Sequence, residues 1–129
     1  MLNPQILAIK RTKWDEAFSG YIRYRDNWTC QRCNKKYIEK SQGLHCSHFV
    51  GRGNWRTRLE PSNAMALCHG CHIYVTANPL DHVKLWEKKF NKKEQKRILN
   101  LKNDMSIKKR DIATKEVLDK LNKMLKNAK

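Results

Sequence analysis

The chain has 129 residues and a formal charge of +16. This length fits one globular domain with at most an appended helical tail. Its residues are 40% hydrophobic and 31% charged, a composition that is polar but excludes a disordered protein. No apolar run approaches the ~18–20 residues of a membrane span, and residues 1–11 lack the apolar core and cleavage site of a signal peptide. We therefore expect neither a membrane nor a secreted protein, but a cytoplasmic one.

The first fifty residues predict an arm, a helix and two short strands. Residues 1–11 form the arm, which ends in two basic residues. The helix begins at Thr12, a good N-cap, and ends near Asn27. Its apolar residues recur at helical spacing: Trp14, Phe18, Tyr21 and Ile22. Strand-like pieces follow at 36–38 and 44–50, separated by the turn signal Ser41-Gln42-Gly43.

The middle of the chain predicts a loop and then a short helix. Residues 51–58 (GRGNWRTR) are rich in glycine and arginine, which is typical of a loop. Residues 59–63 continue as irregular chain because Pro61 disfavours a helix. A short helix is expected around 69–76.

Beyond residue 78 the sequence predicts Lys-rich helices. Asn78-Pro79 is a good helix start, and an apolar face extends from it as far as a break at 103–106. A last helix, over 114–126, carries its leucines and a valine on one side. We divide the chain into an N-terminal arm (1–11), a core (12–80) and a Lys-rich helical extension (81–129).

Four of the five cysteines form two pairs with C-x2-C spacing, Cys30 with Cys33 and Cys68 with Cys71. A cytoplasmic setting keeps thiols reduced, so we do not expect a disulfide framework. Each C-x2-C pair forms a tight turn, called a knuckle here, that directs two thiolates at one metal ion. Two knuckles together supply the four ligands of a tetrahedral Zn²⁺, which predicts a structural zinc site. Free thiols or redox pairs are the alternative. The 34 residues between the knuckles exceed what a plain zinc ribbon needs, so we expect a sizeable insert, with Cys46 as a buried strand residue in it.

Positive charge is found in both halves of the chain, with +7 over residues 1–80 and +9 over residues 81–129. Such an excess favours a polyanionic partner, most often a nucleic acid, because each neutralised phosphate releases condensed counterions. The alternative is a generic basic protein, such as one associated with the ribosome.

The insert between the knuckles carries an ordered set of polar residues. It reads Leu44-His45-Cys46-Ser47-His48-Phe49, then the Arg-rich loop, then Asn63, and His72 follows the last cysteine directly. This order resembles the HNH endonuclease family, whose ββα-metal core has a histidine on its first strand, a central asparagine and a closing histidine on its helix. It is most similar to the phage-encoded branch that includes the NinG-type recombination proteins, through Ser47-His48-Phe49, residues 51–58 and Arg58-Leu59-Glu60-Pro61-Ser62-Asn63. The resemblance covers about residues 12–80.

The resemblance implies a small α+β fold: a zinc-stapled ββα-metal core with an N-terminal helix and a basic C-terminal helical extension. It also implies a metal-dependent DNA endonuclease or nickase in phage recombination or DNA processing, located in the host cytoplasm if phage-encoded, with duplex or branched DNA as partner. We expect His48 to be the general base, since a neutral imidazole near pH 7 can accept a proton. By resemblance, Asn63 fixes that imidazole or the loop beside it, and His72 ligates Mg²⁺ or Mn²⁺.

Two further features bear on this chemistry. Arg52, Arg56 and Arg58 are suited to hold phosphates through their planar donor forks, with a plain solvated loop as the alternative. Ser47 stands where many HNH proteins have a metal-binding aspartate, and it is a weaker ligand for a hard cation. His45, Glu60 and His69 are each candidates for completing the metal shell, although His45 and His69 also fit solvent-facing positions.

Structural roles remain as alternatives for the main site residues: a zinc-adjacent His48, a His72 on a helix surface and an Asn63 that caps a turn. For the whole chain, the alternative functions are a non-catalytic zinc-containing DNA-binding module, which Ser47 favours, and an RNA-directed role. Cleavage assays separate the first alternative, and a comparison of DNA and RNA substrates separates the second.

Overall fold

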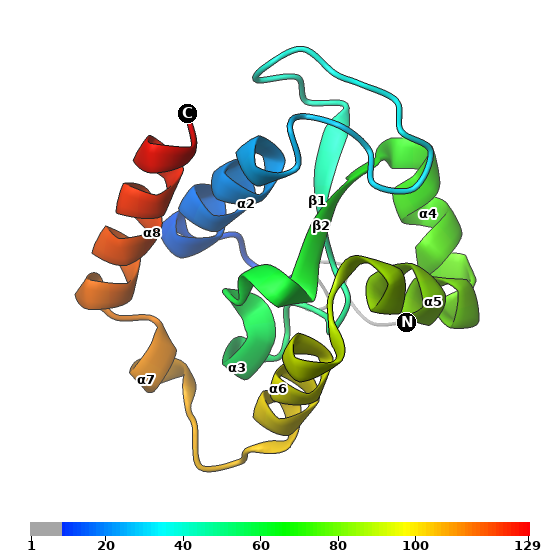
Figure 1. Cartoon of the computed structure of the whole chain (residues 1–129). Helices are drawn as coiled ribbons and strands as arrows, with labels where there is room; N and C mark the ends of the chain where they lie inside the picture. The colour runs from blue at the N-terminus through cyan, green and yellow to red at the C-terminus, as the bar shows by residue number, and fades with distance from the viewer. Residues whose placement is uncertain (1–8) are drawn as a thin grey trace, which may run out of the picture.

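A two-stranded antiparallel sheet lies at the centre of the structure, between one group of helices that includes α2 and α8 and another that includes α4 and α5 (Figure 1). The structure is a computed structural model that describes residues 9–129, so most of the predicted arm lies outside the described residues. The mixture of helices with a small sheet confirms the α+β class. In chain order the elements are α2 (Lys13–Arg25), β1 (Leu44–His48), α3 (Trp55–Arg58), the 3-10 helix η1 (Pro61–Asn63), β2 (Ala64–Cys68), α4 (His69–Ala77), α5 (Pro79–Lys89), α6 (Lys92–Asn103), α7 (Lys109–Ile112) and α8 (Lys115–Ala128).

The sheet is a hairpin whose strands are followed directly by helix α4. Leu44 pairs with Cys68 at one end, and His48 pairs with Ala64 at the other. The first four residues of β2 are all buried, because helices cover both faces of the hairpin. A strand covered on both faces lacks the alternation of apolar and polar residues that identifies a strand in a sequence. The short continuous run of β2 therefore escaped the sequence prediction.

Helix α2 begins where the sequence predicts, at a capping box. The Thr12 hydroxyl accepts a hydrogen bond from the Asp15 backbone N–H, and the Asp15 carboxylate accepts one from the Thr12 backbone N–H. The helix packs against α8, which lies beside it although the two are far apart in the sequence (Figure 1). A Cβ at Gly20 would stand 3.3 Å from a methyl group of Leu125, so glycine permits this close packing of the two helices.

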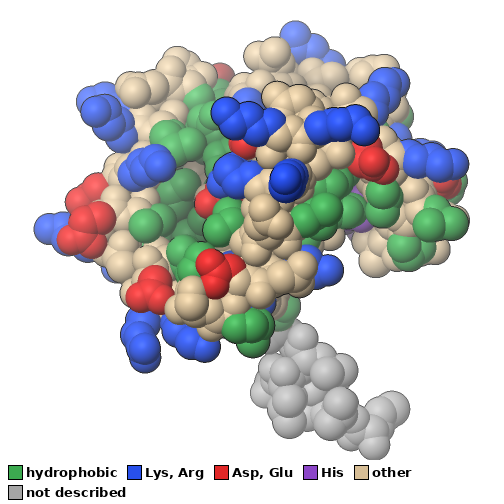
Figure 2. Space-filling view, turned by 60° about the horizontal axis from the view of Figure 1, so that its bottom comes forward, with side chains coloured by type: hydrophobic (Ala, Val, Ile, Leu, Met, Phe, Trp, Pro, Cys, Tyr) green, Lys and Arg blue, Asp and Glu red, His purple; other side chains and the backbone are tan. Residues whose placement is uncertain are grey.

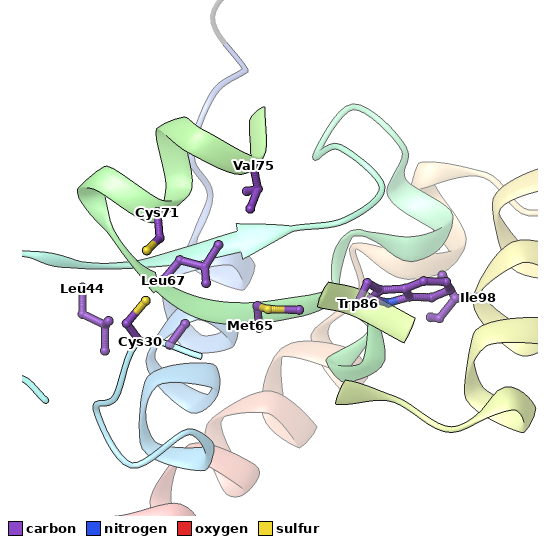
Figure 3. Packing of buried hydrophobic residues seen from close by; sticks show 9 residues of the cluster. Cys30, Leu44, Met65, Leu67, Cys71, Val75, Trp86 and Ile98 are labelled. Atoms are coloured by element: carbon purple, nitrogen blue, oxygen red, sulfur yellow. The ribbon is translucent and has the colours of Figure 1, made fainter. Parts of the chain in front are cut away.

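The helices beyond residue 80 contribute side chains to the same hydrophobic clusters as the two strands. One hydrophobic cluster runs from Cys30, Leu44 and Cys71 to Trp86 on α5 and Ile98 on α6 (Figure 3). A second cluster joins α2 to α8; it contains Ala17, Phe18, Ile22, Leu59, Ala64 and Leu121. Both clusters thus join the predicted core to the predicted extension. The boundary at residue 80 between a core and an extension stays a prediction.

Some predicted elements differ in the structure. The helix expected from Asn78 to the break at 103–106 is interrupted at Phe90, whose backbone is extended, and the Asn91 side chain then caps α6 by accepting from Glu94 N at 2.9 Å. The strand predicted at 36–38 is reduced to a single bridge between Thr29 and Lys36. Helices α3, η1 and α7 were not predicted, because such short turns carry no apolar periodicity.

Lys and Arg side chains are spread over much of the face drawn in Figure 2, with acidic and hydrophobic side chains between them. Among the described residues, no helix has the length and apolar character needed to cross a membrane.

Candidate active site

The four knuckle cysteines come together beside the hairpin. Cys30 and Cys33 lie on a tight turn closed by the Thr29–Lys36 bridge, and Cys68 and Cys71 lie where β2 passes into α4. Their sulfurs all lie within 4.8 Å of one another, and the sulfurs of Cys30 and Cys71 point toward each other (Figure 3).

The spacing of these sulfurs fits zinc. The Sγ atoms of Cys33 and Cys68 are 3.8 Å apart, and Zn–S bonds of about 2.3 Å in a tetrahedron separate two sulfurs by about 3.8 Å. An Arg32 guanidinium nitrogen lies 3.4 Å from Cys71 Sγ, where its charge offsets that of the thiolates. The four cysteines could therefore hold a metal ion, and four thiolates are the ligand set of structural zinc. Such an ion would join the turn that carries Cys30 and Cys33 to the junction between β2 and α4.

His48, the expected base, is the last residue of β1. Its side chain lies on the α2 side of the sheet, with its ring centroid 5.6 Å from that of Phe18. Nε2 lies 2.9 Å from the backbone carbonyl oxygen of Arg58, which only accepts hydrogen bonds, so Nε2 carries the proton and donates it. Burial lowers the pKa of His48 to about 4, although the bond to the Arg58 carbonyl acts in the opposite direction. His48 is therefore neutral at pH 7, and Nδ1 is its basic nitrogen.

Asn63 lies at the entry to β2 and is fully buried. Its Oδ1 accepts from Val50 N at 2.8 Å, and its Nδ2 donates to the carbonyl oxygens of Val50 at 2.9 Å and Thr57 at 3.0 Å. The side chain thus ties the loop after β1 to α3, and none of these hydrogen bonds is to the imidazole of His48. Of the two roles expected for Asn63, its contacts match fixation of the neighbouring loop.

Arg58 does not fit the expected phosphate contact, because its side chain is buried. Only 3% of the residue is exposed, and its guanidinium pairs with both carboxylate oxygens of Asp15, at 2.6 and 2.9 Å. The same guanidinium donates to the backbone oxygens of Lys10 and Arg52. Burial alone would raise the pKa of Asp15, but hydrogen bonds from Arg58 and Thr12 outweigh burial and lower that pKa to about 2. The Arg58 side chain thus joins Arg52 of the loop, Lys10 and α2, while its own backbone carbonyl contacts His48.

The other two predicted arginines differ from each other. Arg56 donates two hydrogen bonds to the Lys102 carbonyl oxygen, at 3.0 and 2.8 Å, near the end of α6. Arg52 lies beside the site, where its guanidinium donates to the Ile9 carbonyl oxygen at 2.8 Å. Of the three, only Arg52 lines the groove that contains His48.

His72, on the first turn of α4, faces His45 on β1. Their Nδ1 atoms are 3.1 Å apart, and burial lowers the pKa of both side chains. His69 is exposed, with its ring centroid 5.2 Å from that of His45. Glu60 lies elsewhere and pairs with Arg97 at 2.9 Å. The structure thus brings His45 to His72 and separates Glu60 from both.

A groove of about 830 Å³ connects these groups. The expected base and the two facing histidines all lie on its wall, and His48 and His45 occupy opposite faces of β1 near its free edge. Cationic side chains that the sequence analysis did not single out also line it: Arg11, Arg23 and Lys40. The groove can therefore take a polyanion along the strand edge, with a basic imidazole on one side and a pair of imidazoles on the other.

The sequence analysis missed Arg11 and Arg23, two of the many basic residues of the chain. Arg11 donates to the Ser19 hydroxyl at 2.8 Å, and Arg23 donates to the Leu44 carbonyl oxygen at 2.8 Å. Arg23 and Ser19 are four residues apart on α2, and Asp15 lies a further four residues back along the helix, so all three lie on one side of α2. This i, i+4 spacing was the available signal, but only the hairpin shows which side of the helix faces the site.

Comparison with known proteins gives one informative relative. Over 63 residues the chain is 32% identical to a protein of Lactococcus phage SK1 named "Probable HNH endonuclease", an alignment that covers 47% of this chain and 67% of that protein. No family model and no solved structure matches the chain. With this identity over two thirds of the relative, and with the cysteine cluster and histidines described above, the chain belongs to the HNH endonuclease family.

Proposed function

We propose that the protein is a metal-dependent DNA endonuclease or nickase, with His48 as the general base in the hydrolysis of a phosphodiester bond. The observation that carries this proposal is the hydrogen bond from His48 Nε2 to the Arg58 carbonyl oxygen. It fixes the tautomer, so that Nδ1 holds a free lone pair on the wall of a cationic groove. Family membership supports a nuclease, and the groove supports the assignment of the base.

In this mechanism His48 takes a proton from the attacking water through Nδ1. The imidazolium that forms is stabilised by the Arg58 carbonyl oxygen, which keeps its hydrogen bond to Nε2, and by the negative charge of Asp15. The buried Arg58–Asp15 pair holds that carbonyl in position. His48 is the catalytic residue, and Asp15, Arg58 and Asn63 are positioning residues.

A divalent ion held by His72 would supply a positive charge that polarises the scissile phosphate and neutralises the leaving oxygen. The donor set fits such an ion: the His72 imidazole is half-buried at the groove wall. Ser47, at the position of the usual aspartate, is buried and does not line the groove, so it adds no ligand to His72 there. The expected products carry a 5′-phosphate and a 3′-hydroxyl.

The DNA contacts are assigned to Arg52 and, in place of Arg56 and Arg58, to Arg11 and Arg23. These three side chains line the same groove as His48. Their guanidinium groups match phosphate oxygens in geometry and charge. The phosphate on which His48 acts would lie between them.

The NinG-type branch and a role in phage recombination or DNA processing are part of the proposal. They rest on Ser47-His48-Phe49, the Arg-rich loop and the segment from Arg58 to Asn63. A non-catalytic DNA-binding module is the second candidate, because Ser47 replaces the aspartate that many HNH proteins use as a metal ligand.

Cleavage of supercoiled plasmid by the zinc-loaded protein tests the proposal. We expect nicking or linearisation that requires added Mn²⁺ or Mg²⁺. Binding without cleavage in any divalent ion, on plain, branched and single-stranded DNA, would contradict the nuclease and support the binding module. Cleavage of RNA with DNA left intact would contradict the assigned substrate.

A further inference from the structure

We propose that His45 is the second protein ligand of the divalent ion, together with His72, and that the two bind it through the Nδ1 atoms that face each other. This inference rests on the proposed function, and it goes further by naming a ligand and a class of metal. It fills the gap left by Ser47, which stands where many family members have an acidic ligand.

The geometry of the pair carries the inference. His45 comes from β1 and His72 from α4, and their Nδ1 atoms are 3.1 Å apart with the rings at 80°. Metal–nitrogen bonds of about 2.0–2.1 Å place neighbouring ligand nitrogens about 2.8–3.4 Å apart, depending on whether the ion is octahedral or tetrahedral. The observed separation lies within that interval.

The position of the pair agrees with this role. Both side chains line the groove that also contains His48, so a phosphate in the groove can reach the same ion. Because residues two apart on a strand share a face, Ser47 lies on the same face of β1 as His45. Ser47 itself is buried and does not line the groove, so His45 is the polar side chain of this face that reaches it.

Two other side chains were candidates for the same role. Glu60 is held by Arg97 at 2.9 Å and does not line the groove. His69 is exposed on α4, and its ring lies against that of His45 in an edge-to-face arrangement. The four knuckle cysteines form a separate cluster. His45 is therefore the side chain that the fold brings to His72.

The donor chemistry predicts which metal binds. Imidazole nitrogen favours first-row transition metals, whereas Mg²⁺ prefers oxygen ligands and gives up its water reluctantly. We therefore expect Mn²⁺ to bind the DNA-free protein more tightly than Mg²⁺, by about tenfold or more.

The test is a titration of Mn²⁺ into the full-length zinc-loaded protein, with free Mn²⁺ followed by electron paramagnetic resonance and no DNA present. His45→Ala and His72→Ala should each weaken Mn²⁺ binding by about tenfold or more. His69→Ala, the matched control, removes the third histidine of this surface and should leave the affinity within about twofold of the unmodified protein. Zinc content and circular dichroism establish that each variant is folded.

A second measurement needs no variant. In the unmodified protein, a second equivalent of Zn²⁺ should shift the ¹⁵N signals of the His45 and His72 Nδ1 atoms and leave those of His69 unchanged. Unchanged signals at the pair would mean that the two imidazoles are simply hydrogen-bonded to each other, and would overturn the inference.

The outcomes separate this inference from the proposed function. Loss of Mn²⁺ binding in His72→Ala but not in His45→Ala overturns the role of His45 and leaves the nuclease intact. An equal loss in His69→Ala, or Mg²⁺ bound as tightly as Mn²⁺, also overturns it. Absence of Mn²⁺ binding in the unmodified protein overturns the site, and the plasmid assay then decides separately whether the protein is a nuclease.

Discussion

The imidazole of His48 donates a hydrogen bond from Nε2 to the backbone carbonyl oxygen of Arg58, at 2.9 Å. The residue that supplies this carbonyl is itself fixed, because the Arg58 guanidinium is buried against both carboxylate oxygens of Asp15. The orientation of one imidazole thus depends on an ion pair between α2 and α3.

Breaking the ion pair should destabilise the protein. Asp15→Ala leaves the guanidinium of Arg58 buried without a counter-charge, and we expect the free energy of unfolding to fall by about 3–5 kcal/mol. Glu16→Ala is the matched control, since Glu16 is the exposed acidic neighbour on the same helix; it should change stability by less than about 1 kcal/mol. Urea denaturation of the zinc-loaded proteins measures both. Equal effects of the two substitutions would contradict the role of the pair.

Stability should depend on pH through His48. Because burial lowers the pKa of His48 from 6.5 to about 4, the unfolded chain binds the proton first as pH falls. The free energy of unfolding should therefore rise with pH between about 4 and 6.5 and level off above, with a total contribution on the order of 3 kcal/mol.

Thermal midpoints between pH 5 and 7.5 test this dependence. His48→Phe removes the titrating group and keeps a ring next to Phe18, so its midpoint should fall less steeply toward pH 5 than that of the unmodified protein. The same pH dependence in both proteins would show that His48 does not titrate with a lowered pKa.

Zinc removal should unfold the segment from Cys30 to His72, because structural zinc contributes folding free energy directly. We expect one Zn²⁺ per chain, bound far more weakly in Cys68→Ser. Cys46→Ser should retain the zinc, since Cys46 lies outside the cluster. A chelated sample that kept its circular dichroism and thermal midpoint would contradict a structural role for the metal.

DNA affinity should depend on the arginines of the groove and not on every arginine of the loop. The double variant Arg11→Gln and Arg52→Gln should bind duplex DNA more weakly and lower the slope of log K against log salt by about 2, one for each lost phosphate contact. Arg56→Gln removes one positive charge as well, but the Arg56 guanidinium is bonded to the Lys102 carbonyl oxygen and does not line the groove. The DNA affinity of this variant should therefore stay close to that of the unmodified protein. A loss in Arg56→Gln equal to half that of the double variant would indicate binding by net charge alone.

The sequence predicted those features that depend on local spacing. The two C-x2-C pairs, the Thr12 cap and the Asn78-Pro79 start depend on residues that are close in the chain, and each appears in the structure. The break at Phe90 was missed because the apolar stripe continues through it, although Asn91 with Glu94 was a readable capping signal.

The site itself was only partly predictable, because its geometry depends on contacts between distant segments. The same arginine-rich loop supplies Arg52 to the groove, Arg56 to the end of α6 and Arg58 to Asp15, 43 residues away. Nothing in the local sequence shows which of the three arginine side chains is buried and which one lines the groove. His45 likewise meets His72 only because the hairpin folds β1 onto α4.

The most direct test of the account compares nicking of supercoiled plasmid by the unmodified protein and by His48→Ala, both zinc-loaded and in Mn²⁺, with DNA binding measured in parallel. We predict that the variant binds DNA within about twofold of the unmodified protein and cleaves it about 10²–10⁴-fold more slowly, the usual contribution of a general base. Cleavage at an undiminished rate by a folded His48→Ala would contradict the assignment of the base.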